Sequence, residues 1–130
     1  MTGDILDQAV RYFLEQHIAT EVDLQVLLAL MEGGRRWWDA DALASIMGVP
    51  SAVARRSLES LTAKNLLDIR VSDAIRYQLQ PGSSSLESGI NRFAAAYRRS
   101  PSAILRWGES LVAGRPRSAS IARPVSRRPT

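Results

Sequence analysis

The feature that most constrains the fold of this chain is a pair of short segments in which apolar and polar residues alternate. The apolar positions are Leu67, Ile69 and Val71 in residues 66–71, and Ile75, Tyr77 and Leu79 in residues 75–80. A side-chain period of two is typical of β-strands, and a connection of three residues is typical of a hairpin. We therefore predict one β-hairpin over residues 66–80, with one buried face.

The rest of the chain, up to residue 113, predicts helices. Its apolar side chains recur at three- and four-residue spacing, as on the buried face of an amphipathic helix. The expected helices span residues 4–18, 20–32, 39–47, 51–64, 84–99 and 101–113. Residues of the kinds that cap helix starts precede or open four of them: Thr20, Asp39, Ser51 and Ser84. The expected fold class is mainly α with a small β-hairpin.

Three further segments complete the expected organisation. Residues 35–38 (RRWW) are too short for a helix and predict an extended link or short strand. We expect one of the two tryptophans in the core and the other partly exposed, in preference to a stacking platform for bases. Asn65 stands where a left-handed residue closes the preceding helix. Residues 114–130 are rich in Pro, Ser and Arg without any period, which predicts a disordered basic tail.

Residues 43–67 (LASIMGVPSAVARRSLESLTAKNLL) resemble the bacterial winged helix-turn-helix regulators of the MarR type and its relatives. The positions that carry the resemblance are Leu43, Ala44, Met47, Gly48, Val49, Ala54, Arg56, Leu58, Leu61 and Leu66. A small residue at Ala44 lets two helices cross, and Gly48 permits the tight turn between them. The resemblance implies a winged helix-turn-helix with extra N- and C-terminal helices, and it does not resolve the subfamily.

The expected domain organisation follows from this resemblance. Residues 20–81 form the winged helix-turn-helix, and residues 1–19 and 82–113 form terminal helices for packing or dimerisation. In such regulators terminal helices often build a dimer, so we expect a homodimer held by these two segments. Residues 114–130 lie outside the domain as the basic tail.

The same resemblance implies a DNA-binding surface. The helix over residues 51–64 is the expected recognition helix, with Ser51, Ala52, Arg55, Arg56 and Glu59 on or near its outward side. Arginines at such positions bind guanine O6 and N7 or phosphate in a major groove. Arg70 and Arg76 lie on the outward face of the hairpin, where they flank the wing. A solvated helix face, with Glu59 paired to Arg55 or Arg56, is the plain structural alternative.

Net charge supports this hypothesis less than its total suggests. The formal net charge is +4, with a pI near 10.3. It divides into −5 for residues 1–34, +4 for residues 35–114 and +5 for residues 115–130. The basicity therefore belongs mostly to the tail, and Asp73 at the hairpin tip would repel phosphate. These features keep an alternative open, a winged-helix module for protein–protein interaction that does not bind DNA.

Composition excludes several other classes of function. The chain has no cysteine and one histidine, His17, so thiol chemistry, disulfides and a histidine-rich metal site are excluded. No glycine-rich phosphate loop occurs, and the acidic pairs stand at helix starts, where capping explains them. We expect no enzyme activity, no metal and no cofactor. No apolar run approaches the ~18 residues of a membrane span, and we expect a cytoplasmic DNA-binding regulator.

Overall fold

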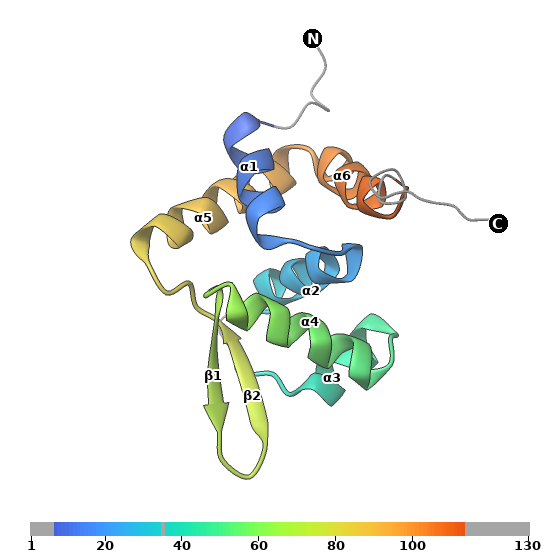
Figure 1. Ribbon diagram of the computed structural model, residues 1–130, viewed down its shortest axis with the longest axis vertical. Helices are drawn as coiled ribbons and strands as arrows, with labels where there is room; N and C mark the ends of the chain where they lie inside the picture. Colours follow the sequence, from blue (N-terminus) through green and yellow to red (C-terminus); the bar gives the residue numbers. More distant parts are fainter. Residues whose placement is uncertain (1–6, 35, 114–130) are drawn as a thin grey trace, which may run out of the picture.

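The computed structural model describes residues 7–34 and 36–113. The part it describes is mainly helical with one two-stranded antiparallel sheet, which confirms the predicted class at this level (Figure 1). In chain order the elements are α1 (Gln8–His17), α2 (Glu21–Glu32), α3 (Ala40–Met47), α4 (Ser51–Ala63), β1 (Leu67–Val71), β2 (Ile75–Leu79), α5 (Ser84–Arg99) and α6 (Pro101–Ala113).

Helix α2 lies at the centre of the molecule. It packs against α4, α6 and β2, with α1, α5 and α6 above it and α3, α4 and the hairpin below it in Figure 1. Its buried apolar residues, Leu24, Val26, Leu27, Leu28 and Leu30, point in several directions around the helix. A single apolar stripe was predicted, but α2 is enclosed because helices pack on more than one of its sides. Thr20 caps its start, with its Oγ1 accepting a hydrogen bond from the Asp23 amide at 3.1 Å.

Helices α3 and α4 form a tightly connected pair. The Asp39 carboxylate accepts a hydrogen bond from the Ala42 amide at 2.7 Å and so caps α3 as predicted. Gly48 has a φ of +73°, a left-handed conformation that costs glycine little, and it closes α3. The predicted Ser51 cap is wrong: Pro50 occupies the N-cap position, and Ser51 is already the first helical residue. Proline's fixed φ suits that extended entry to the helix.

The hairpin joins its strands at the predicted connection. Leu67 pairs with Leu79, and Val71 pairs with Ile75 beside the turn. An isolated bridge adds Trp38, which exchanges backbone hydrogen bonds of 2.7 and 2.8 Å with Tyr77. The residues before α3 therefore lie beside β2, and β1 is the outer strand. This confirms the extended link expected at residues 35–38 for the part of it that the structure describes.

The prediction that one hairpin face is buried is wrong for its outer half. Leu67 at the base and Tyr77 on the middle rung are 5% and 2% exposed, whereas Ile69, Val71 and Ile75 are 43%, 70% and 48% exposed. There are two physical reasons. The strands continue past the helices toward the turn (Figure 1), and on the middle rung Tyr77 is covered beside the Trp38 link whereas its partner Ile69 lies on the outer strand. Alternation reports which side chains share a face, but it does not report how far another layer extends over that face.

Helices α1, α5 and α6 close the other end of the core. Phe13 on α1 and Phe93 on α5 meet with ring centroids 6.5 Å apart. Gly89 permits this approach, since a Cβ there would lie 2.5 Å from the Phe13 ring. Ser83, and not the predicted Ser84, caps α5 by accepting from the Leu86 amide at 3.2 Å. None of the helices in the described part of the chain is long and apolar enough to cross a membrane.

Candidate functional site

Helix α4 has one buried row and one exposed row. The buried row consists of Ala54, Ser57, Leu58 and Leu61. On the other side Ala52, Arg55, Arg56 and Glu59 are exposed, and Ser51 is half-buried. The five predicted residues of this helix therefore lie on its accessible side or at its start. Within residues 7–34 and 36–113, neither Arg55 nor Arg56 forms an ion pair, so the alternative pairing with Glu59 is absent there.

A shallow hollow connects α4 to the hairpin. It has a volume of about 180 Å³, and its lining includes Arg55, Ala74, Ile75 and Tyr77, with Asp39 and Asp41 from the start of α3. Burial raises the pKa of the Tyr77 phenol, the Glu59 carboxylate raises it further, and the Arg55 guanidinium opposes them. The charges of Arg55 and Glu59 on α4 therefore act on the Tyr77 phenol of β2.

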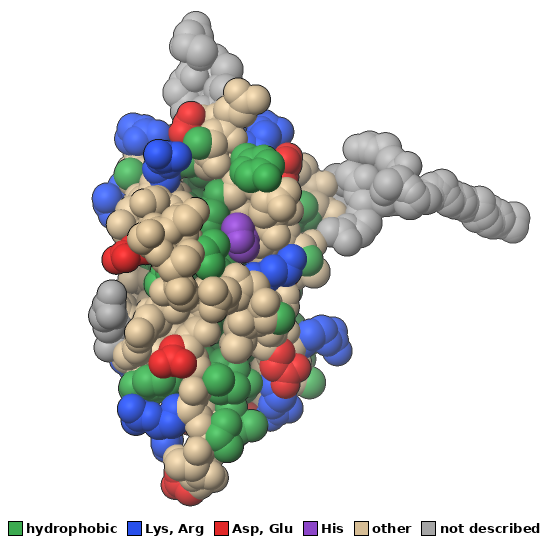
Figure 2. Space-filling model, turned by 60° about the vertical axis from the view of Figure 1, so that its left-hand side comes forward, with side chains coloured by type: hydrophobic (Ala, Val, Ile, Leu, Met, Phe, Trp, Pro, Cys, Tyr) green, Lys and Arg blue, Asp and Glu red, His purple; other side chains and the backbone are tan. Residues whose placement is uncertain are grey.

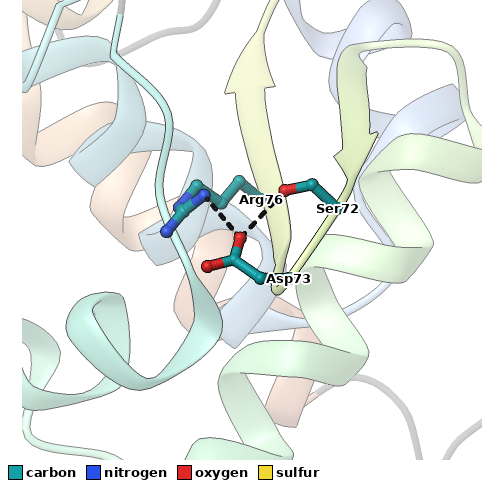
Figure 3. A network of polar contacts seen from close by, with 3 residues as sticks. All are labelled: Ser72, Asp73 and Arg76. Carbon is teal, nitrogen blue, oxygen red and sulfur yellow. Dashed lines mark hydrogen bonds and ion pairs between the residues drawn. The ribbon is translucent and has the colours of Figure 1, made fainter.

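Arg70 and Arg76 face each other across the two strands. They are direct partners in the antiparallel ladder, which places both side chains on the same face of the sheet. The Arg70 guanidinium lies over the Trp37 ring, 4.3 Å from its centroid. Arg76 instead forms an ion pair with Asp73, with 3.7 Å between Nη1 and Oδ1 (Figure 3).

Asp73 accepts from two sides at the tip of the hairpin. The Ser72 hydroxyl donates to its Oδ1 at 3.0 Å, and Arg76 lies on the other side of the same oxygen (Figure 3). The Ser72 hydrogen bond, a backbone hydrogen bond and the Arg76 charge lower the pKa of the Asp73 carboxyl. The tip therefore carries a stable negative charge next to one of the two predicted hairpin arginines.

The two tryptophans divide as predicted. Trp38 is 4% exposed and belongs to the core, whereas Trp37 is half-buried and lies under Arg70. Arg36 lies 4.0 Å from the centroid of Trp38, and Arg35 is outside the described residues. Sequence reasoning identified Arg70 and Arg76 but missed their partners Trp37 and Asp73. The pairing register, which follows from the three-residue turn, was the signal that could have revealed the Arg70–Arg76 opposition.

Charge on the accessible surface is mixed. In the face seen in Figure 2, Lys and Arg side chains alternate with Asp and Glu, and apolar side chains lie between them near the hairpin end. Helix α4 and the hairpin, which carry the four predicted arginines, also carry Glu59, Asp68 and Asp73. Asp39 and Asp41 add two more carboxylates at the start of the neighbouring α3. A single continuous basic face is therefore not present on that view.

Three further observations concern possible metal ligands, His17 and a second groove. No group of three or more His, Cys, Asp or Glu residues that could hold a metal ion occurs in the described part of the chain. The Nδ1 atom of His17 lies 2.9 Å from the Phe13 carbonyl oxygen, and its ring packs on Phe13. A larger groove of about 500 Å³ lies between α2 and α5, and none of the predicted site residues lines it.

Comparison of the chain with models of known protein families, with curated proteins and with solved structures finds no match. A function for this chain therefore has to be inferred from the geometry of α4 and the hairpin.

Proposed function

We propose that this protein binds double-stranded DNA sequence-specifically through α4 and acts as a transcriptional regulator. The order α2, Trp38 bridge, α3, Gly48 turn, α4 and hairpin supports the winged helix-turn-helix resemblance of residues 43–67. The observation that carries the proposal is the pair Arg55 and Arg56. Both are exposed on the second helix of the α3–α4 pair, without an ion-pair partner in the described residues.

The chemistry of α4 fits a major groove. Arginine is the side chain that most often reads guanine, through paired hydrogen bonds to O6 and N7. Glutamate accepts a hydrogen bond from the cytosine amino group, so Glu59 adds a second base contact one turn further along the helix. Ser51 and Ala52 stand at the helix start, where amides and the helix dipole favour phosphate.

The proposal includes a symmetric dimer. Two copies would place their α4 helices in successive major grooves roughly 34–36 Å apart, on a pseudo-palindromic site. The terminal helices α1, α5 and α6 lie at the end of the molecule opposite the hairpin (Figure 1). Tyr12 and Leu105 are 65% and 44% exposed there, and they supply apolar surface for the contact between copies.

Selection of bound fragments from random duplex DNA tests this proposal. The wild-type chain should enrich a defined, pseudo-palindromic sequence. Arg56→Ala should weaken binding to that sequence by about 1–3 kcal/mol and relax preference at one position per half-site. Lys64→Ala, a change at an exposed basic residue that follows α4 and lies outside the terminal helices, should leave both the affinity and the sequence preference unchanged. Unchanged affinity and preference in Arg56→Ala would remove Arg56 from base readout, and no enrichment by the wild type would refute the proposal.

A second candidate, a protein–protein interaction module, is favoured by a different observation. The apolar tip, which we define as Ile69, Val71 and Ile75, exposes three β-branched side chains on one face of the hairpin. Exposed apolar clusters mark interaction surfaces more often than isolated apolar residues do. If Val71→Thr abolishes association with a partner protein while DNA enrichment is absent, this second function replaces the first.

A further inference from the structure

Two arginines that face each other across a β-ladder need compensation. Side chains in directly opposite positions lie close together, and like charges there are destabilising. In this hairpin Arg70 and Arg76 are such a pair. Each is compensated by a different neighbour, Arg70 by the π-face of Trp37 and Arg76 by the carboxylate of Asp73. We call the four residues Trp37, Arg70, Asp73 and Arg76 the polar face of the hairpin.

The two contacts differ in how far they leave each arginine available to bind an anion. An aromatic ring attracts the cation without occupying its hydrogen-bond donors and without adding a negative charge. Arg70 is exposed, and its guanidinium lies over the Trp37 ring, a contact that leaves its hydrogen-bond donors available. Asp73 instead supplies a full negative charge to Arg76 and would itself repel a phosphate. Its side chain is 85% exposed, so that repulsion would act at the surface.

We propose that the polar face of the hairpin is a phosphate-binding surface with one active and one restrained arginine. Arg70 binds a phosphodiester of the duplex, Trp37 is the positioning residue that orients it, and Asp73 restrains Arg76 and so limits affinity. This inference rests on the proposed function, because its ligand is the backbone of the DNA that α4 reads. Arg55 of α4 lines one hollow with Ala74 of the turn and Ile75 of β2, which places the hairpin tip beside α4. Ile75 belongs to the apolar face, so the polar face lies on the other side of the same tip.

The restraint is tested by a double-mutant cycle in the full chain, on the best duplex from the selection. Asp73→Asn should tighten binding by up to about eightfold at 0.1 M salt and steepen the salt dependence by ~0.9, the effect of one added phosphate contact. In an Arg76→Gln background the same change should give a clearly smaller gain, because only the direct repulsion between Asp73 and phosphate is removed and no cation is released. Glu32→Gln removes an exposed carboxylate at the end of α2, away from α4, the hairpin and the terminal helices, and is the control for net charge alone.

The orientation of Arg70 is tested by a second cycle. Trp37→Leu should weaken binding and make the salt dependence shallower, whereas in an Arg70→Gln background it should have little further effect. Trp37→Phe keeps an aromatic face and should restore most of the affinity. Thermal unfolding of each variant shows whether the hairpin still folds, and the salt slope is a readout that loss of stability alone does not shift.

The outcomes separate this inference from the proposed function. If the wild type binds and Arg56→Ala weakens binding, but Asp73→Asn has equal effects with and without Arg76, the restraint is refuted and the function stands. Equal effects of Trp37→Leu with and without Arg70 refute the positioning role in the same way. If the wild-type chain binds no duplex, both the function and this inference are overturned.

Discussion

At the scale of single residues, the end of α4 shows what the sequence does and does not reveal. Asn65 has a φ of +67°, so it takes the left-handed conformation predicted for it, one that glycine adopts with least strain. Its carbonyl oxygen accepts a hydrogen bond of 2.9 Å from the amide of Gly82. A Cβ at residue 82 would lie 2.5 Å from the Asn65 Cγ. The local role of Asn65 was therefore predictable, but its contact with Gly82 depends on the return of the chain after β2.

This contact predicts the effect of Gly82→Ala. The added methyl should displace the short Asn65 side chain and lower the free energy of unfolding by about 1–3 kcal/mol, the usual cost of overpacking. Asn65→Gly removes the obstructing side chain and suits the positive φ, so Gly82→Ala should cost much less in that background. Urea unfolding of the four proteins measures both values. An equal loss of stability in the two backgrounds would contradict the proposed clash.

At the scale of elements, the hairpin was the most predictable part of the fold and the least predictable part of the surface. Alternation and the three-residue turn set its strands, and the register confirms them. The exposure of Val71 and the partner of Arg70 were not predictable, because they depend on which layer covers the hairpin and on Trp37 beyond its edge. In helix α4 the surface was predictable, because the row of buried residues determines which side chains lie on the exposed side.

The buried Tyr77 phenol of β2 predicts that the free energy of unfolding depends on pH. Because burial and Glu59 raise the pKa of Tyr77 above its ordinary value of 10.0, the folded state holds the phenolic proton more tightly than the unfolded state. The associated stability is fully present below the unfolded pKa and is lost as pH rises through the folded pKa. The free energy of unfolding should therefore decline above about pH 10, and Tyr77→Phe should reduce that decline. An unchanged decline in Tyr77→Phe would contradict this assignment.

At the scale of the whole molecule, the helical periodicities predicted the elements but not their arrangement. One hydrophobic core includes Leu14 of α1, Leu27 of α2, Leu58 of α4 and Phe93 of α5, so the terminal helices and the middle of the chain share it. The acidic N-terminal third also has a structural part: Asp23 is 3% exposed, and its carboxylate accepts from the Ala19 amide and from Ser60 of α4. Net charge counted along the sequence does not distinguish such a residue from a solvated one.

The distribution of charge over the chain predicts how the tail contributes to binding. Residues 115–130 carry five arginines and no acidic residue, and they lie outside the described residues. If α4 supplies the base contacts, these arginines add only attraction to phosphate, which is independent of sequence and weakened by salt. Deleting residues 115–130 should therefore weaken binding most at low salt and leave the selected sequence unchanged. The salt slope should become shallower by up to ~0.9 for each phosphate that the tail neutralises in the wild type.

Replacing the five arginines with glutamine keeps the length of the chain and should reproduce the effects of the deletion. A changed sequence preference in either variant would show instead that the tail takes part in base readout.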